Sequence, residues 1–417
     1  MDIMKRKLTI LGVAFTLIAS VMLGGCFNRG PNIVATNLMR GISSNNLAAE
    51  PFTSNFVSAK AIFSVELFRQ ALQAEKNTLI SATSVMNALA MAANGADGDT
   101  LREMEHALAG MPLSRLNRHL HSFNNSLFSD IRSQLEIANS IWFRENGFNV
   151  NHDFLQTNAD YFGADAFAAP FNNRTITDIN NWIRYHTAGM IDSIIDDIGD
   201  DMVMYLINAV MFDAEWAQIY FEHQISQQPF FAFDGKQQNA RMMRSTETIF
   251  IEDGLATGFI KPYHGGHYSF VALLPKEGVC IMDYVQSMSG AGFLNTIKNA
   301  RELRVQAALP QFEFEFDLSL VDALEGMGMR NAFIGDIADF TGIGTAHAPI
   351  FISEVEHATF ISVDTRGTRA GAVTSVGMQA TSAPQFDRTV ILDRPFVFAI
   401  IDNASSLPIF MGTVLGV

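Results

Sequence analysis

The segment Tyr205-Leu-Ile-Asn-Ala-Val-Met-Phe212 decides the fold, because it is a short apolar run set between Asp201 and Asp213. Runs of this length and composition predict a buried β-strand. Two later segments have the same character, Ser269-Phe-Val-Ala-Leu-Leu274 and Arg304-Val-Gln-Ala-Ala-Leu309. The second half of the chain is therefore expected to supply most strands of a sheet.

Helix signals dominate the first half. Ser84 can cap a helix that runs to the stop signal at Asn94 and Gly95, and Thr100 can cap the next helix, with Glu103 three residues later. Helices that come first and strands that come later, without strict alternation, indicate an α+β fold with a large, mainly antiparallel central sheet.

The composition is that of a folded protein. The chain has 417 residues, 48% of them hydrophobic and 17% charged, which is enough apolar material for a large core. The formal net charge of −15 comes from 28 Lys and Arg against 43 Asp and Glu. This charge disfavours nucleic acid or an anionic membrane surface as a partner.

The first 25 residues are interpreted as an export signal. Lys5, Arg6 and Lys7 precede an apolar run over residues 8–22, which leads to Leu23-Gly-Gly-Cys26. This ending is similar to a bacterial lipobox and predicts lipidation of Cys26, while an ordinary secretory signal is the alternative. Residues 26–54 are expected to form a flexible tether and residues 55–417 a single domain. We expect the protein at the bacterial cell envelope, surface-exposed or extracellular, bound to the membrane through the lipid alone.

Sites for chemistry are few. Cys280 is the one cysteine besides Cys26, and its apolar neighbours predict a buried, inert thiol. The pair His264 and His267 flanks two glycines, which favours a hairpin turn over a metal site. No catalytic motif of the common hydrolase, nucleotide-binding or metalloprotease types occurs, so we expect no enzyme activity, no cofactor and no metal.

Further motifs follow one another along the chain in a specific order. They are Asn77-Thr-Leu-Ile-Ser81, Ala138-Asn-Ser-Ile-Trp142, Ile179-Asn-Asn-Trp182, Leu273-Leu-Pro-Lys276, Leu309-Pro-Gln-Phe312 and Asp393-Arg-Pro-Phe-Val-Phe398. Together with the central segment 205–212, this series resembles the serpin family over residues 57–417. The resemblance implies a serpin fold, with helices packed on a large central sheet, further smaller sheets and an exposed reactive loop.

The resemblance also implies a function. A serpin of the inhibitory type is cleaved once by a serine protease, and its loop then inserts into the central sheet and traps the acyl-enzyme. The partner would be an elastase-like or subtilisin-like protease, with papain-like cysteine proteases as an alternative, and the inhibitor would be a monomer. The competing interpretation is a non-inhibitory serpin that acts as a binding or structural module.

The expected hinge begins at Gly367. Alternate residues of an inserted strand share one face of the sheet. One set contains Thr368, Ala370, Ala372 and Thr374 and carries no charge, whereas the other set contains Arg369. Since a charge on the core face is costly, the first set is expected to face the core. The sequence departs from the family at Thr365, Arg366 and Arg369, where Glu is common.

The cleaved bond is expected near residues 378–383. Counting from the hinge along the resemblance places it at Thr381-Ser382, with Ala380-Thr381 and a cut after Met378 as neighbouring choices. Small residues on both sides suit a protease with a shallow primary pocket.

Three polar residues match family positions under the central sheet, at the point where it opens. Ser84, Asn208 and His357 are expected to form a buried hydrogen-bond cluster that controls strand separation. The alternative, a satisfied core histidine with no control role, stays open.

Overall fold

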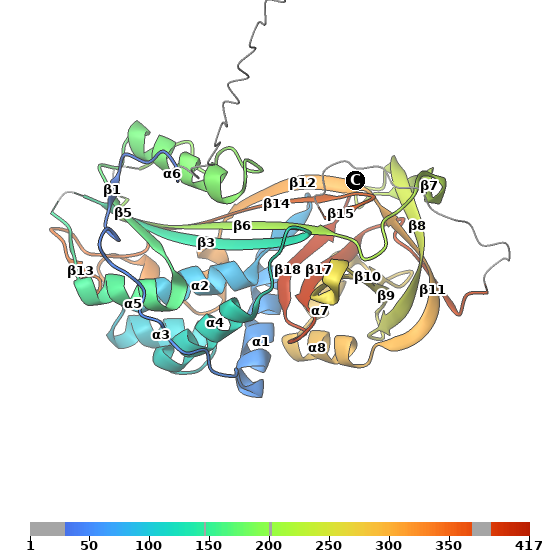
Figure 1. Cartoon of the computed structure of the whole chain (residues 1–417), viewed down its shortest axis with the longest axis horizontal. Coiled ribbons are helices and arrows are strands. Elements are labelled where there is room, and N and C mark those ends of the chain that lie inside the picture. Colours follow the sequence, from blue (N-terminus) through green and yellow to red (C-terminus); the bar gives the residue numbers. More distant parts are fainter. Residues whose placement is uncertain (1–29, 146, 200–201, 369–384) are drawn as a thin grey trace, which may run out of the picture.

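The computed structural model describes residues 30–145, 147–199, 202–368 and 385–417. These residues form two large sheets, a small third sheet and a layer of helices (Figure 1). The α+β prediction is confirmed. In the described residues, no helix is long and apolar enough to span a bilayer.

The central sheet has seven strands in the order β1-β5-β3-β6-β15-β14-β12. Most neighbours are antiparallel, but β5 runs parallel to β3 and β14 runs parallel to β6. The strands are β1 (Thr36–Asn37), β3 (Ser133–Arg144), β5 (Asp165–Ala169), β6 (Met204–Glu215), β12 (Phe312–Ser319), β14 (Glu354–Val363) and β15 (Gly367–Thr368).

The second sheet has nine strands. It is therefore larger than the sequence analysis suggested, which expected only smaller sheets beside the central one. Its order is β16-β11-β8-β9-β10-β17-β18-β2, with β7 paired to β8, and a third sheet joins β4 (Asn149–Val150) to β13 (Gly344–Thr345). The nine strands are β2 (Thr78–Ile80), β7 (Ile225–Phe231), β8 (Gln237–Glu252), β9 (Ala256–Pro262), β10 (Tyr268–Pro275), β11 (Arg301–Pro310), β16 (Arg388–Ile391), β17 (Phe396–Asp402) and β18 (Pro408–Val414).

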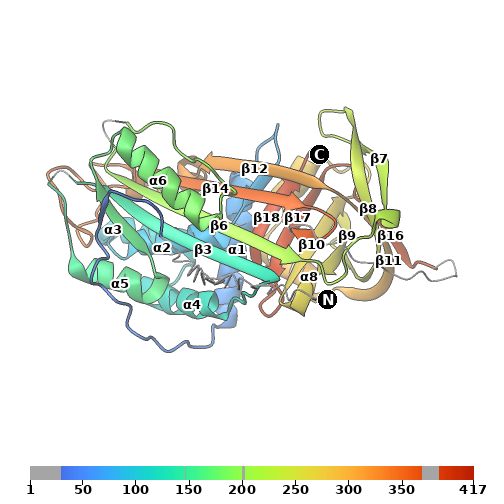
Figure 2. The ribbon, with the colours of Figure 1, turned by 45° about the horizontal axis from the view of Figure 1, so that its top comes forward.

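Nine α-helices occur in the described residues. They are α1 (Ser54–Gln70), α2 (Ala82–Ala93), α3 (Gly98–Leu108), α4 (Leu113–Ser126), α5 (His152–Phe162), α6 (Asn173–His186), α7 (Ile281–Ser287), α8 (Gly290–Lys298) and α9 (Val321–Gly326). Helix α6 crosses one face of the central sheet, and α2 to α5 lie on the other (Figures 1 and 2). We call these the outer face and the core face.

Strand β6 is buried on both faces, which explains its unbroken apolar run. Its even-numbered residues, such as Leu206 and Val210, pack into the main core, while Ile207 and Ala209 pack under α6. A strand covered on both faces has no polar side to alternate with. The strand predicted from this run is confirmed.

The predicted helix caps at Ser84 and Thr100 are wrong. Helix α2 begins at Ala82 after Ser81, and α3 begins at Gly98 after Asp97, whose carboxylate accepts the backbone N–H of Gly98. Ser84 and Thr100 instead lie inside their helices and are buried. Ser84 is thereby directed at the central sheet rather than at the end of its own helix.

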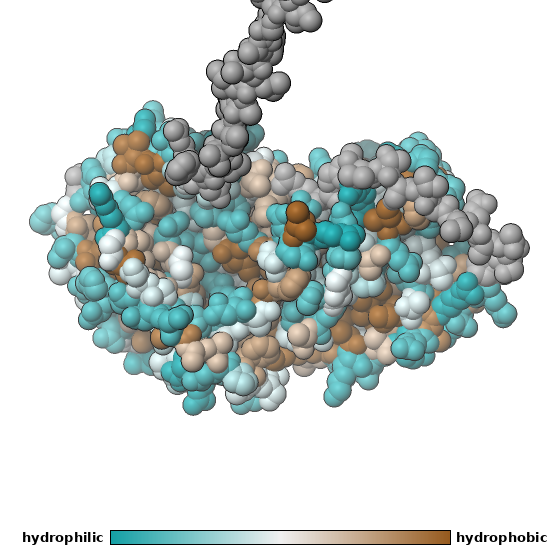
Figure 3. Space-filling model, viewed as in Figure 1, coloured by the Kyte–Doolittle hydropathy of each residue, from teal (hydrophilic) through white to brown (hydrophobic). Residues whose placement is uncertain are grey.

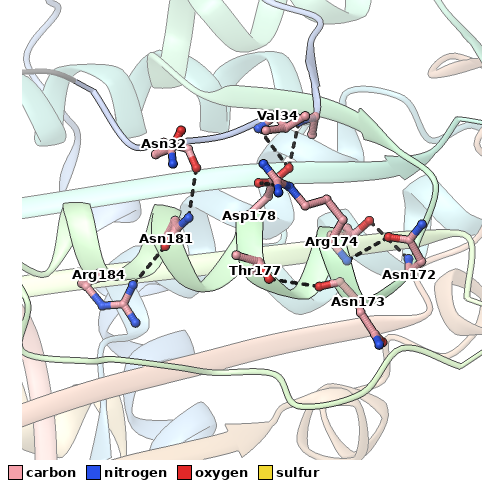
Figure 4. Close-up of polar contacts among 11 residues, drawn as sticks. Asn32, Val34, Asn172, Asn173, Arg174, Thr177, Asp178, Asn181 and Arg184 are labelled. Atoms are coloured by element: carbon pink, nitrogen blue, oxygen red, sulfur yellow. Dashed lines mark hydrogen bonds and ion pairs between the residues drawn. The ribbon is translucent and has the colours of Figure 1, made fainter.

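The flexible tether predicted for residues 26–54 does not describe residues 30–53, which lie along the domain. Thr36 and Asn37 pair with β5 at the edge of the central sheet. The Asp178 carboxylate on α6 accepts the backbone N–H groups of Val34 and Ala35, at 3.0 and 2.8 Å (Figure 4). The segment thus supplies an edge strand and backbone donors that a free tether would leave in water.

The prediction of a buried thiol at Cys280 is also wrong. Cys280 is exposed, because it occupies the N-cap position before α7 while its neighbour Ile281 turns inward.

On the face seen in Figure 3, apolar patches are scattered among hydrophilic side chains. Scattered apolar residues of this kind are normal for a soluble surface.

Lys60 on α1 is fully buried. Its Nζ donates to Thr83 Oγ1 at 2.8 Å and lies 4.9 Å from the centre of the Phe123 ring. In the described residues, its one side-chain hydrogen bond is to this hydroxyl, and no carboxylate contributes to its pKa. Burial without a countercharge lowers the pKa of Lys60 to about 7.

We therefore expect Lys60→Met to stabilise the intact protein. The folded state binds the Lys60 proton less tightly than the unfolded state, so the penalty is fully present below pH 7 and disappears as the pH rises towards 10.5. Its upper limit is on the order of 5 kcal/mol. Urea unfolding of both proteins between pH 6 and 10.5 would measure the difference in stability. A difference that stays constant across this range would contradict the assignment.

Candidate functional site

The hinge residues Gly367 and Thr368 form the short strand β15 between β6 and β14. Thr368 pairs with Ala214 on one side and with Val363 on the other, and Gly367 pairs with Glu215. Thr368 therefore already lies in the central sheet of the intact chain, before any cleavage of the loop.

Thr368 is buried on the core face, with 2% of its surface exposed. Its hydroxyl lies 2.5 Å from the hydroxyl of Tyr263, whose ring stacks on Trp216 at 4.5 Å between ring centres. Burial raises the pKa of Tyr263, so this tyrosine stays neutral. Thr368 therefore lies against the neutral hydroxyl of an aromatic pair, a setting that suits a small hydroxyl side chain.

Gly367 is required by a close backbone approach. A Cβ atom at this position would lie 1.9 Å from the carbonyl oxygen of Ala214. Any other residue would push β15 away from β6, because backbone atoms cannot yield as a flexible side chain can.

Below the hinge, β6 and β14 pair directly with each other. Their parallel ladder joins residues 205–209 to residues 354–358. Residues 210–213 and 359–362 separate this ladder from the hinge pairs in the described part of the chain. The two strands thus diverge from a closed lower end towards an upper end that holds β15.

The predicted cluster of Ser84, Asn208 and His357 lies at the closed end. His357 and Asn208 are register partners, and Nδ1 of His357 donates to Oδ1 of Asn208 at 2.9 Å. The backbone N–H of Ser81 donates to Nε2 of His357 at 3.1 Å. The Asn208 amide donates to the hydroxyl of Ser84 and to Oδ1 of Asn139, the latter at 2.5 Å.

These hydrogen bonds require a neutral imidazole, because Nε2 accepts while Nδ1 donates. Complete burial lowers the pKa of His357 to about 3, in agreement with this role. The cluster ties β14 to β6, β3 and α2 through buried polar groups, so separation of β6 from β14 must break it.

Sequence reasoning missed two members of this site. Asn139 belongs to the motif at residues 138–142 and is the register partner of Asn208 on β3. Tyr263 follows β9 directly and reaches the hinge through the hydroxyl of Thr368. Both contacts join residues more than 60 positions apart, and pairing of β3 with β6 was the signal that could have placed Asn139.

The remaining predicted site residues lie outside the described residues. They are Cys26, Ala370, Ala372, Thr374, Met378, Ala380, Thr381 and Ser382. The described chain ends in the central sheet at Thr368 and resumes at Gln385, ahead of β16 in the second sheet. The segment that connects these two sheets therefore contains the predicted reactive bond.

A sheet that holds the start of a further strand between two diverging neighbours fits the loop insertion that the resemblance to serpins implies. The family model described as serpin (serine protease inhibitor) matches residues 58–417. The chain belongs to the serpin family, whose members are generally protease inhibitors rather than enzymes, and the resemblance in its motifs is confirmed.

Relatives support the same assignment. An uncharacterised serpin-like protein of Thermococcus kodakarensis is 27% identical, with 97% of this chain and 98% of the relative covered. Human serpin B4 is 26% identical, with 85% and 97% covered.

The crystal structure of the thermophilic serpin tengpin in its native state is similar to this structure, with 46% identity, 92% of this chain and all of tengpin covered, and a TM-score of 0.89. Tengpin in its latent state, at 45% identity, gives a TM-score of 0.80, with 89% of this chain and all of tengpin covered. The fold described here thus resembles the native state more closely than the latent one.

Proposed function

We propose that this protein is an inhibitor that traps a serine protease by inserting its cleaved loop into the central sheet. The observation that carries this proposal is the position of β15. Gly367 and Thr368 already pair with β6 and β14, so the next residues of the loop can continue the same strand without a change of register.

The register supports the alternation found in the sequence. If the strand continued along β6 and β14 from the pairs of Thr368, the core-facing positions would go to Ala370, Ala372 and Thr374. Thr374 would then fall in the row that Asn208 and His357 now share. Insertion would replace the bond between Asn208 and His357 with a threonine hydroxyl that can donate and accept, so both partners keep a hydrogen bond.

The decisive experiment is incubation of the mature protein with elastase-like, subtilisin-like and papain-like proteases. We expect a covalent complex that survives SDS with a member of the first two classes. Clean cleavage without a complex would support the alternative, a non-inhibitory serpin that serves as a binding module. Turnover of a small ester would indicate a hydrolase and contradict both.

We place the reactive bond at Thr381-Ser382. A proteolytic fragment that begins at Ser382 should then be released when the complex is denatured, and its mass identifies the bond. Fragments that begin after Met378 or Ala380 would select one of the neighbouring bonds instead.

We further propose that the protein is exported and anchored through lipid on Cys26, on the strength of the signal-like residues 1–25. Replacement Cys26→Ala should release the protein from the membrane fraction or block processing. Mass spectrometry of the mature N-terminus provides the check, and an unmodified Cys26 there would contradict the anchor. Two or more acyl chains are needed for firm attachment.

A further inference from the structure

Glu215, the last residue of β6, binds two arginines. Its Oε1 lies 2.9 Å from a terminal nitrogen of Arg366, the residue directly before the hinge glycine. Its Oε2 lies 2.6 Å from a terminal nitrogen of Arg132 and accepts from Arg132 Nε at 2.8 Å. Glu215 therefore connects the hinge to the start of β3, and we call Arg132, Glu215 and Arg366 the hinge clamp.

The pair at the hinge is shielded from solvent. The side chains of Arg366 and Glu215 are 18% and 22% exposed, whereas Arg132 is 49% exposed. Burial raises the pKa of Glu215, but the hydrogen bonds and charges of Arg132 and Arg366 outweigh it and hold this pKa below its usual range. Glu215 is thus a carboxylate at neutral pH, in a setting where an ion pair is stronger than on an open surface.

Backbone hydrogen bonds hold the same turn. The carbonyl of Arg366 accepts from Trp216, and the carbonyl of Thr365 accepts from Tyr220, both at 2.7 Å. The Asp364 carboxylate accepts the backbone N–H of Arg366 at 2.7 Å. Residues 364–366 are therefore bound to the end of β6 from both their backbone and their side chains.

We propose that Glu215 is a positioning residue for strand insertion, because its ion pair with Arg366 fixes the register in which the hinge enters the sheet. This proposal rests on the inhibitory function proposed above. A slip of one residue would put a side chain where Gly367 meets the Ala214 carbonyl and would also move Arg366 away from Glu215. Steric exclusion and charge thus select the same register.

The departure from the family at Arg366 has a direct reason in this chain. A glutamate there would face the Glu215 carboxylate and repel it, whereas arginine is attracted to it. The clamp accordingly explains why a basic residue replaces the common acidic one at this hinge position.

The first test uses hydrogen exchange on the intact protein, which needs no target protease. We expect Glu215→Gln and Arg366→Gln to accelerate exchange in peptides covering residues 214–220 and 363–368 by about tenfold or more. Arg132→Gln is the matched control, because it removes the other arm of the clamp and leaves the hinge pair in place. Unchanged exchange in Arg366→Gln, or an equal change in Arg132→Gln, would overturn the proposal.

The second test measures the number of inhibitor molecules consumed per protease inactivated. This number should rise about threefold or more for Glu215→Gln and return towards the wild-type value for Glu215→Asp. The double variant of Glu215→Gln and Arg366→Gln should be no worse than either single variant. If the effects of the two substitutions on this number were additive, the proposed coupling between Glu215 and Arg366 would be contradicted. If the wild type forms no complex, the proposed function fails while the exchange result still decides whether the clamp holds the hinge.

Discussion

Replacement Thr368→Arg is expected to convert the protein from an inhibitor into a substrate. The native threonine is buried beside the neutral hydroxyl of Tyr263 and is 2% exposed. An arginine there would bury an unpaired charge, which costs several kcal/mol, or would expel β15 from the sheet. In either case the loop loses its start point, and insertion becomes too slow to outrun release of the protease.

The measurement is again the number of inhibitor molecules consumed per protease inactivated, which we expect to rise at least about tenfold, a rate effect of about 1.4 kcal/mol or more. Thr368→Val keeps the shape and removes the hydroxyl, so it should have a much smaller effect. Ser362→Arg places the same charge on the outer face of β14, beside Glu313, and should cost little. Equal values for Thr368→Arg and Ser362→Arg would refute the assignment of the two faces.

The structure changes what this experiment reports. Because Thr368 is already inserted, the arginine acts on the intact protein as well as on the inserting loop. The thermal midpoint of the intact variant must therefore be measured alongside its inhibition. A loss of inhibition with a nearly unchanged midpoint locates the defect in insertion itself.

Local pattern predicted those parts of the fold in which one segment determines its own structure. The apolar run at residues 205–212 could be assigned to a buried strand, because a strand that is buried on both faces has apolar residues without polar alternation. The alternation after Gly367 assigns the charged and the uncharged residues to opposite faces of a strand, and this assignment needs no knowledge of the neighbouring strands. Thr368 lies on the core face, whereas Ala370 to Thr374 lie outside the described residues and keep their predicted positions as proposals.

Contacts between distant segments could not be predicted in this way. The docking of residues 34–35 depends on Asp178, more than 140 positions away, and on the free edge of β5. Nothing in the local composition of this segment distinguishes it from a flexible tether, since its contacts are made mainly by backbone groups. Likewise, the pairing of Glu215 with Arg366 follows from the sheet register rather than from either residue's neighbours.

The position of a helix N-terminus explains why the predictions for Cys280 and Ser84 were wrong. Cys280 has apolar neighbours, but the N-cap position directs it outward. Ser84 has the residue type of a cap, yet the N-cap of α2 is Ser81, three residues earlier, and every residue of this helix is buried. A shift of three positions is small for a helix boundary, but it moves Ser84 from a helix end to the cluster with Asn208.

Cleavage of the loop is expected to raise the thermal midpoint of the protein by about 10 °C or more. Continued insertion would pair residues 210–213 of β6 and 359–362 of β14 with a new strand and then open the ladder below them. Roughly ten additional backbone hydrogen bonds at about 1 kcal/mol each would contribute about 10 kcal/mol. At roughly 1 °C per kcal/mol for a chain of this size, this gives a shift of about 10 °C.

Calorimetry of the intact and the cleaved protein tests this, with the cleaved Thr368→Arg variant as the control. In the register of β15, the loop can insert only after Thr368 has entered the sheet. An arginine at position 368 should therefore remove most of the increase in thermal midpoint, although the same bond is cleaved. The buried hydrogen bond between His357 and Asn208 holds β6 and β14 together at the closed end. We propose that Thr374, once inserted, would offer a new hydrogen-bond partner to both residues. Equal midpoints before and after cleavage would mean that the loop does not enter the sheet, and β15 would then be a fixed edge of the intact fold rather than the first residues of an inserting strand.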